Sequence, residues 1–175
     1  MRIAVLTIST AGSRGERNDT SGDSIVSWAT SRGYEIAQRK LVPDDATEIV
    51  RSLASWCDGD VADVVLTTGG TGLSPTDVTP EATSAVIERE AAGFSEWLRM
   101  SAAPKFPRAV LSRGRSGVRH RTLIINLPGS PGGVADALAA LQAVIDHAVA
   151  VLRGEVGDHG TEGRKDSGTT RRDQG

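Results

Sequence analysis

The sequence predicts an α/β fold, namely a three-layer α/β/α sandwich with a mostly parallel sheet. Short apolar runs rich in Val, Ile and Leu alternate along the chain with stretches that carry apolar residues at helical spacing. This alternation favours right-handed crossovers and a parallel sheet with helices on both faces. The 175 residues, 38% of them hydrophobic, are enough for one domain with its own core.

Three strands alternate with two helices in the first half of the chain. The first strand covers residues 3–9, and a polar loop over residues 10–22 leads to a helix that ends at Gly33. Pro43 begins the turn after the second strand, and Thr47 is the predicted cap of the next helix. The second and third strands cover residues 34–42 and 61–66.

The second half continues this pattern with weaker signals. A helix over residues 80–90 and a short helix around Trp97 lie on either side of Gly93. Residues 109–112 are expected to form a small strand, and residues 122–127 a clear one. One long helix follows, with an apolar stripe that consists of Val134, Leu138, Leu141, Ile145, Ala148 and Leu152.

The apolar pattern stops at the end of this long helix, which predicts a domain boundary. We expect residues 1–153 to form the domain. Residues 154–175 are rich in glycine and in charges of both signs, with almost no apolar residues. Such a composition predicts a disordered polar tail.

Composition argues against nucleic-acid, redox and membrane functions. The formal charge is −2 and the isoelectric point is near 5.9, without the basic stripe typical of nucleic-acid binding. Cys57, the single cysteine, falls on the apolar side of a predicted helix and is interpreted as a buried hydrophobe. No stretch is long and apolar enough to cross a bilayer, and none resembles a cleaved signal segment, so we expect a cytoplasmic protein.

A glycine-rich loop joins the third strand to the next helix and is the most informative segment of the chain. Glycines let backbone N–H groups come close to a ligand, and a helix start capped by Thr79 adds further free donors. The expected ligand is therefore an anion such as a phosphate. Asp77 would repel a phosphate unless a cation lay between them, which indicates Mg²⁺. The alternative is an ordinary loop in which Asp77 forms an Asx-turn. The expected phosphate contacts are Thr68, Gly69, Gly70, Thr71 and Gly72.

Two earlier loops bring further polar side chains to the same edge of a parallel sheet. Asp44 follows the second strand and can pair with Asp77 on a divalent ion, whereas Asp45 more simply favours a helix start. Asp19 and Ser21 open the first helix. Their common role there is helix capping, and the same residues can also face a ligand.

The loop after residue 127 reaches this edge too. Gly129, Ser130 and Pro131 suit either a plain turn or close backbone approach to a ligand, and their position favours the second. Ser112 and Arg113 are candidate phosphate contacts. The basic residues nearby, which a solvated face explains, are Arg115, Arg119, His120 and Arg121.

Six motifs carry a resemblance to a known family. In order they are Asp19-Thr20-Ser21-Gly22, Val42-Pro43-Asp44-Asp45, Thr67-Thr68-Gly69-Gly70-Thr71-Gly72, Asp77-Val78-Thr79-Pro80-Glu81-Ala82, Leu111-Ser112-Arg113 and Asn126-Leu127-Pro128-Gly129-Ser130-Pro131. Over roughly residues 3–153 the chain resembles the molybdenum-cofactor biosynthesis family of the MogA and MoaB type, which includes the G domain of gephyrin. The resemblance implies a MogA-like fold, a homotrimer or in some members a hexamer, and binding of molybdopterin, a pterin dithiolene with a terminal phosphate.

The resemblance also implies an activity. In the adenylyltransferase members, the terminal phosphate of molybdopterin attacks the α-phosphorus of Mg-ATP and pyrophosphate leaves. The product is then ready for a molybdenum insertase as the downstream partner. By this resemblance the residues for Mg²⁺ and catalysis are Asp44 and Asp77, those for nucleotide phosphates are 68–72 and 129–131, and those facing molybdopterin are Ser112, Arg113, Asp19 and Ser21.

One departure and two alternatives stay open. Many relatives place an aspartate directly after the serine of the first strand, whereas here Thr10 follows Ser9. A MoaB-type protein could bind molybdopterin without adenylylating it. A deamidase-like nucleotide hydrolase has the same fold, although Thr71 and the pair Asp77-Val78 suit the cofactor family better.

Overall fold

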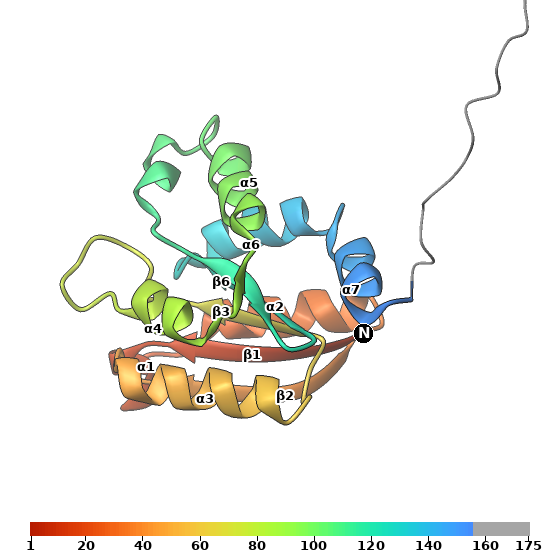
Figure 1. Cartoon of the computed structure of the whole chain (residues 1–175). Coiled ribbons are helices and arrows are strands. Elements are labelled where there is room, and N and C mark those ends of the chain that lie inside the picture. Colours follow the sequence, from red (N-terminus) through yellow and green to blue (C-terminus); the bar gives the residue numbers. More distant parts are fainter. Residues whose placement is uncertain (156–175) are drawn as a thin grey trace, which may run out of the picture.

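The computed structural model describes residues 1–155, so most of the tail predicted over residues 154–175 lies outside the described residues. A six-stranded sheet has the strand order β2-β1-β3-β6-β5-β4. Figure 1 shows helices on both of its faces. The elements are β1 (Arg2–Ile8), α1 (Thr10–Ser13), α2 (Thr20–Ser31), β2 (Glu35–Val42), α3 (Ala46–Asp58), β3 (Val64–Thr68), α4 (Thr79–Val86), β4 (Arg89–Glu90), α5 (Ala92–Ala102), the 3-10 helix η1 (Pro107–Leu111), β5 (Ser116–Arg119), β6 (Thr122–Leu127), α6 (Pro131–Leu141) and α7 (Ile145–Arg153).

Four strands of the sheet pair in parallel, and β5 and β4 extend the sheet beyond β6 through antiparallel pairing. β1 pairs in parallel with β2 on one side and with β3 on the other, and β3 pairs in parallel with β6. β5 pairs antiparallel with β6, and β4 with β5. The strand order reverses between β1 and β3, and parallel α/β sheets bind ligands beside the carboxyl ends of strands at such a point.

Both faces of the central strands are buried. Ile3 and Val5 of β1 pack with α2, α5, α6 and α7, whereas Ala4 and Leu6 pack with α3 and α4. Successive side chains of a strand point to opposite faces, so a strand covered on both sides is apolar throughout. The predicted three layers are therefore confirmed.

The prediction of one long carboxyl-terminal helix is wrong, because the chain bends by 61° between α6 and α7. A straight helix over residues 131–153 would run about 34 Å. β1 has 7 residues, and a strand of that length spans about 23 Å. The bend keeps Ile145 and Val149 buried against the sheet instead of beyond its end. Within residues 1–155 no single helix is long and apolar enough to cross a membrane, although α6 and α7 pass that test together as a bent pair.

Two predictions near the antiparallel edge are also wrong. Residues 109–112, predicted as a strand, fall in and just after the 3-10 helix η1, because Pro107 fixes φ at its start. The helix predicted over residues 80–90 ends at Val86, and β4 follows. β4 and β5 are too short and too polar to give a strand signal in the sequence.

Two predicted helix caps are replaced by neighbouring residues. The N-cap of α3 is Asp45 rather than Thr47, because the Asp45 carboxylate accepts a hydrogen bond of 2.9 Å from the N–H of Glu48. Val78 occupies the N-cap position of α4 without a side-chain bond. The hydroxyl of Thr79, the predicted cap, donates to the carbonyl of Gly69 instead.

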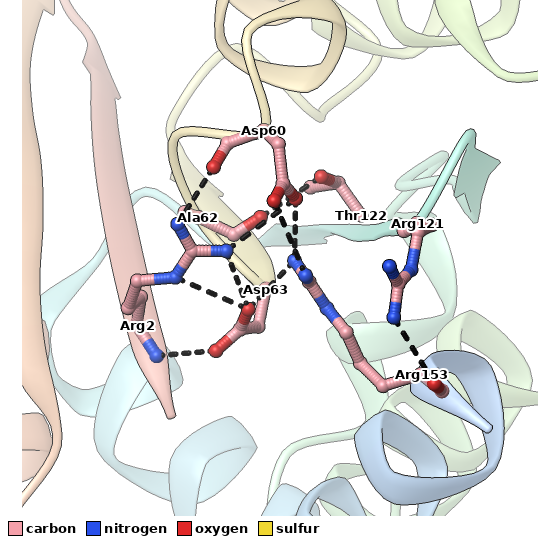
Figure 2. Close-up of polar contacts among 7 residues, drawn as sticks. All are labelled: Arg2, Asp60, Ala62, Asp63, Arg121, Thr122 and Arg153. Carbon is pink, nitrogen blue, oxygen red and sulfur yellow. Dashed lines mark hydrogen bonds and ion pairs between the residues drawn. The ribbon is translucent and has the colours of Figure 1, made fainter. Parts of the chain in front are cut away.

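An ion-pair network fixes α7 to the sheet at the edge remote from the glycine loop (Figure 2). The backbone N–H of Arg2 donates to Oδ2 of Asp63 at 2.6 Å, and Arg2 Nη2 lies 2.9 Å from Oδ1. Nη2 of Arg153, the last residue of α7, lies 2.6 Å from the same Oδ1. The side chains of Arg153 and Asp63 are only 10% and 11% exposed, so this pair is a buried one.

The charges of this network shift the pKa of Asp63. Burial alone would raise that pKa, but the hydrogen bonds from Arg2 and the charges of Arg153 and Arg2 outweigh burial and hold it below its usual value. A lowered carboxyl pKa contributes stability above the ordinary Asp value of about 4, and this contribution is lost as the pH falls further.

We expect Asp63→Asn to lower the free energy of unfolding by roughly 2–4 kcal/mol at pH 7, because it removes the buried charge partner of Arg153. Urea denaturation measures this. The difference from the wild type should narrow below about pH 4, where the wild-type carboxylate takes up a proton. Glu90→Gln, which removes the exposed partner of Arg115, is the control and should change stability by less than about 1 kcal/mol. A stability difference that stays constant from pH 7 to pH 3 would show that the charge of Asp63 does not stabilise the fold.

Candidate functional site

Two hollows lie at the carboxyl ends of the parallel strands. The larger hollow, of about 630 Å³, is lined by the glycine loop, α5, η1 and the start of α6. The smaller hollow, of about 220 Å³, is lined by the end of β1, the start of α2 and Asp44. Gly129 lines both, and a Cβ placed on it would lie 3.2 Å from Cα of Gly69. The two glycine-containing loops therefore meet between the hollows.

The backbone conformation of the glycine loop requires glycine at two positions. Gly69 has φ +100° and Gly70 has φ +62°, both in the region that side-chain-bearing residues rarely adopt. A Cβ on Gly69 would collide with the carbonyl oxygen of Ile8, and one on Gly70 would collide with Oγ1 of Thr79. Both glycines are therefore fixed by conformation and by space.

Thr79 holds two carbonyl groups of this loop. Its hydroxyl donates to the carbonyl of Gly69 at 2.9 Å, and its N–H donates to the carbonyl of Gly70 at 3.1 Å. Within residues 1–155, the N–H groups of Gly70, Thr71 and Gly72 donate to no other residue. All three residues line the larger hollow. The loop thus offers backbone donors to an anion, as the sequence predicts.

The late loop brings a helix start to the same hollow. Oγ of Ser130 caps α6 by accepting from the N–H of Gly133 at 3.2 Å, and Ser130 lines the larger hollow. The hydroxyl of Thr68 donates to the carbonyl of Pro128 at 2.6 Å, and that of Ser21 donates to the carbonyl of Gly129 at 2.9 Å. Thr68 and Ser21 thus hold this loop in place, while the start of α6 favours a negative charge in the hollow.

Asp77 lines the larger hollow, and one of its carboxylate oxygens is hydrogen-bonded within the protein. Its Oδ2 accepts a hydrogen bond of 2.9 Å from the N–H of Ser74, three residues earlier, so the side chain closes the loop backwards instead of forming an Asx-turn. A Cβ on Gly72 would lie 2.8 Å from this oxygen. Within the described residues, Oδ1 of Asp77 accepts no hydrogen bond, so it is available to a ligand.

Asp44 lines the smaller hollow and is held by Thr10. Its Oδ2 accepts from the N–H of Thr10 at 2.8 Å and from the Thr10 hydroxyl at 2.7 Å, and that hydroxyl accepts from the N–H of Asp44 at 3.1 Å. Oδ1 lies 3.2 Å from the position of a Cβ on Gly70. The threonine that departs from the family pattern therefore orients this carboxylate.

The two predicted metal ligands approach one loop from different hollows. Asp44 lies beside Gly70 and Asp77 beside Gly72, each with one oxygen held by the protein. Among residues 1–155, no group of three or more His, Cys, Asp or Glu side chains could hold a metal by itself. Mg²⁺ usually takes one or two carboxylates together with substrate phosphates and water. The donor set therefore fits Mg²⁺ only in combination with a bound phosphate.

The predicted molybdopterin contacts differ in their surroundings. Asp19 lines the smaller hollow, but it caps α2 through a 2.8 Å bond from the N–H of Gly22, and its other oxygen accepts from Thr7 and Arg39, each at 2.8 Å. Ser112 lines the larger hollow. Arg113 turns toward the glycine loop, where its Nε donates to the carbonyl of Gly72 at 2.7 Å.

Sequence reasoning missed the basic side chains of α5 and the segment after it. Arg99, Lys105 and Arg108 line the larger hollow, and the guanidinium of Arg108 lies 5.4 Å from the ring centre of Phe106. A signal was present, because residues 97–113 contain four cationic residues and no Asp or Glu. These cations suit a ligand with several negative charges.

Comparison with known proteins identifies the family. A family model described as a probable molybdopterin binding domain matches residues 4–147. The chain belongs to this molybdopterin-binding family. The match includes both carboxylates, the glycine loop and the late loop, so the resemblance drawn from the six motifs is confirmed.

Individual relatives agree with this family. The chain is 36% identical over 156 residues to molybdopterin adenylyltransferase of Helicobacter pylori strain J99, which covers 88% of this chain and 89% of that protein. It is 38% identical over 130 residues to molybdenum cofactor biosynthesis protein B of Escherichia coli K12, which covers 74% and 75%. The solved structure of MoaB from Thermus thermophilus has a TM-score of 0.83 and 45% identity, over 87% of this chain and 96% of that one. The MogA-like fold is therefore confirmed.

We expect Thr10→Val to lower the free energy of unfolding by about 1 kcal/mol, because it removes the hydroxyl that bonds to Asp44 and leaves the N–H of Asp44 without its acceptor. Urea denaturation at pH 7 measures the change. Thr10→Ser keeps the hydroxyl and is the matched control, with stability close to the wild type. If the valine variant is as stable as the serine variant, Thr10 does not hold Asp44 as described.

Proposed function

We propose that this protein transfers AMP from ATP to the terminal phosphate of molybdopterin, with release of pyrophosphate, in the biosynthesis of the molybdenum cofactor. The observation that carries this proposal is that the glycine loop, Asp77, the start of α6 and Ser112 line one hollow of about 630 Å³. Small-molecule sites typically have about 300–1,000 Å³. Relatives with the name molybdopterin adenylyltransferase, at 36% and 37% identity, support the same function.

The proposed transfer exchanges one phosphorus–oxygen bond for another. An oxygen of the molybdopterin phosphate attacks the α-phosphorus of ATP, the bond from that phosphorus to the bridging oxygen breaks, and pyrophosphate leaves with the electron pair. Such a reaction depends on positioning and on charge neutralisation rather than on a covalent bond to the protein. The chain offers backbone donors at residues 70–72, the positive end of α6 and the cations Arg99, Lys105 and Arg108.

The two aspartates have a role next to these donors. We propose that Asp77 and Asp44 hold Mg²⁺ together with the ATP phosphates, because each keeps one oxygen free of bonds to the described residues. Bound Mg²⁺ supplies neutralisation of the phosphate charge. Thr10 and Ser74 each fix the second oxygen, so both carboxylates have a defined direction.

The proposed substrates divide the site. Nucleotide phosphates lie against the glycine loop and against Gly129 and Ser130, while the pterin lies toward Ser112 and α5. Pro131 begins α6 and fixes this helix start. Contacts of Asp19 and Ser21 with molybdopterin stay a prediction, since both side chains already serve the fold.

We propose a homotrimer, with a hexamer as the alternative, located in the cytoplasm. Large apolar side chains near the site support assembly, since Met100 is 70% exposed and Val110 63% exposed. The adenylylated product would pass to a molybdenum insertase. None of these statements requires a membrane or a nucleic acid as partner.

A molybdopterin-binding protein without transferase activity is the second candidate. Identity to Escherichia coli protein B, at 38%, is about the same as identity to the adenylyltransferases, at 36% and 37%. The site residues that bind both substrates are the same in the two proposals, so only turnover separates them. A deamidase-like hydrolase is the third candidate, and ammonia release from nicotinamide mononucleotide would reveal it.

The decisive assay incubates the purified protein with molybdopterin and Mg-ATP and measures pyrophosphate and adenylylated molybdopterin. We expect both products from the wild type, and turnover lower by on the order of 100-fold in Asp77→Asn, because an ionised ligand of the phosphate-bound cation is lost. Molybdopterin binding should be unchanged in this variant.

Asp146→Asn is the matched control, because Asp146 pairs with Arg32 on the surface and lines neither hollow. Its turnover should equal that of the wild type. Binding of molybdopterin without product in the wild type would favour the second candidate. Wild-type turnover in Asp77→Asn would exclude the proposed role of this carboxylate.

A further inference from the structure

The guanidinium of Arg113 contacts the segment that carries Asp77. Its Nε donates to the carbonyl of Gly72 at 2.7 Å, and its Nη2 donates to the carbonyl of Asp77 at 2.6 Å. Nη1 forms an ion pair with the carboxylate of Glu81. The backbone N–H of Arg113 also donates to the carbonyl of Thr71 at 2.8 Å. One residue thus bonds to both ends of the segment over residues 71–77.

This segment has few other fixed contacts. It contains no helix or strand, and residues 73–76 are exposed, with Leu73 65% exposed. Its internal bonds all involve Ser74, which bonds to Asp77 through the Asp77 carboxylate and through the N–H of Asp77, and to Thr76 through the two hydroxyls and the N–H of Thr76. Exposed segments with few buried contacts open locally at low free-energy cost. The bonds from Arg113 are therefore important for where Asp77 lies.

Glu81 completes the arrangement from the first turn of α4. The hydrogen bond from Arg113 lowers the pKa of Glu81 below its usual value, against the opposing effect of burial. The guanidinium is a rigid planar fork whose nitrogens all donate here, one to Gly72, one to Asp77 and one to Glu81. Nη2 also donates to the second carboxylate oxygen of Glu81 at 3.5 Å. Four of the five N–H donors are therefore engaged, and no pair is left to bind a phosphate.

The same stretch of chain is also tied to α5. Arg99 donates to the carbonyl of Gly114 at 3.2 Å and to that of Ser112 at 3.4 Å. Ser112 and Arg99 line the larger hollow on the side of α5. Residues 112–114 therefore connect the α5 side of the hollow, through Arg113, with the segment that carries Asp77.

We propose that Arg113 is a positioning residue, which acts on the reaction by holding Asp77 at the larger hollow and not by contact with molybdopterin. The inference rests on the proposed transfer of AMP for its effect on activity. Its structural part, the bracing of residues 71–77, does not depend on that function and can be measured without any substrate.

The first experiment measures amide hydrogen exchange of the ligand-free full chain. Arg113→Met keeps the aliphatic stem and removes the donors, so amides of residues 72–78 should exchange on the order of tenfold faster than in the wild type. Arg115→Met is the matched control, because Arg115 pairs with the half-exposed Glu90 and not with the loop. Exchange in Arg113→Met equal to that of the control would overturn the proposal.

Two further variants allow the same exchange measurement if Arg113→Met folds poorly. Arg113→Lys keeps the charge but not the fork, so exchange of residues 72–78 should also rise. Glu81→Gln lies on an exposed helix surface and removes only the ionic partner, so a smaller rise of about threefold is expected. Wild-type exchange in both variants would also overturn the bracing role.

The second experiment separates positioning from direct binding. In Arg113→Met the KM for Mg-ATP should rise on the order of tenfold, while the calorimetric Kd for molybdopterin without ATP stays at the wild-type value. A weakened molybdopterin Kd with unchanged exchange would make Arg113 a direct pterin ligand and overturn the proposal. If the wild type transfers no AMP, the proposed function fails, and the exchange experiment still decides whether Arg113 braces the loop.

Discussion

The backbone of the glycine loop approaches its neighbours more closely than any side chain permits, and the rest of the site is arranged around this approach. Gly69 lies against the carbonyl of Ile8 and Gly70 against Thr79, both at positive φ. Gly129 in turn lies against Gly69. The backbone after β3 is therefore in close contact with the end of β1 on one side and with the backbone after β6 on the other. The carbonyl groups of Gly69 and Gly70 accept from Thr79, while the N–H groups of residues 70–72 bond to no described residue and can donate to an anion.

The two carboxylates of the site, Asp44 and Asp77, are held in the same way by different residues. Each has one oxygen held by the protein, in Asp44 by Thr10 and in Asp77 by the N–H of Ser74. Oδ1 of Asp44 lies next to Gly70 and Oδ2 of Asp77 lies next to Gly72, so the two carboxylates flank the loop that offers N–H groups to an anion. Arg113 adds a further restraint on the second carboxylate by bonding to the main chain of its own segment.

The sequence predicts those features that local chemistry decides. The buried strands, the glycine loop and the position of Asp77 follow from apolar runs and from residues with special backbone requirements. The bend between α6 and α7 could not be predicted, because it depends on the length of the sheet below. The bonds of Arg113 to Gly72 and Asp77 could not be predicted either, because the direction of a long side chain depends on its tertiary neighbours. The sequence allows two roles for Asp19 and Ser21, helix capping and contact with a ligand. In the structure their hydrogen bonds stabilise the fold.

The proposed phosphate site depends on the close approach of the backbone at Gly70 to Thr79. Titration calorimetry of Mg-ATP against Gly70→Ala tests this most directly, with Gly93→Ala as the control, because a Cβ on Gly93 meets nothing within 4 Å. Gly70→Ala should lose at least about tenfold in affinity for Mg-ATP, since its Cβ must displace Thr79 from the loop. Gly93→Ala should bind as the wild type does. A folded Gly70→Ala protein that binds Mg-ATP with wild-type affinity would show that phosphate binding does not depend on this close approach.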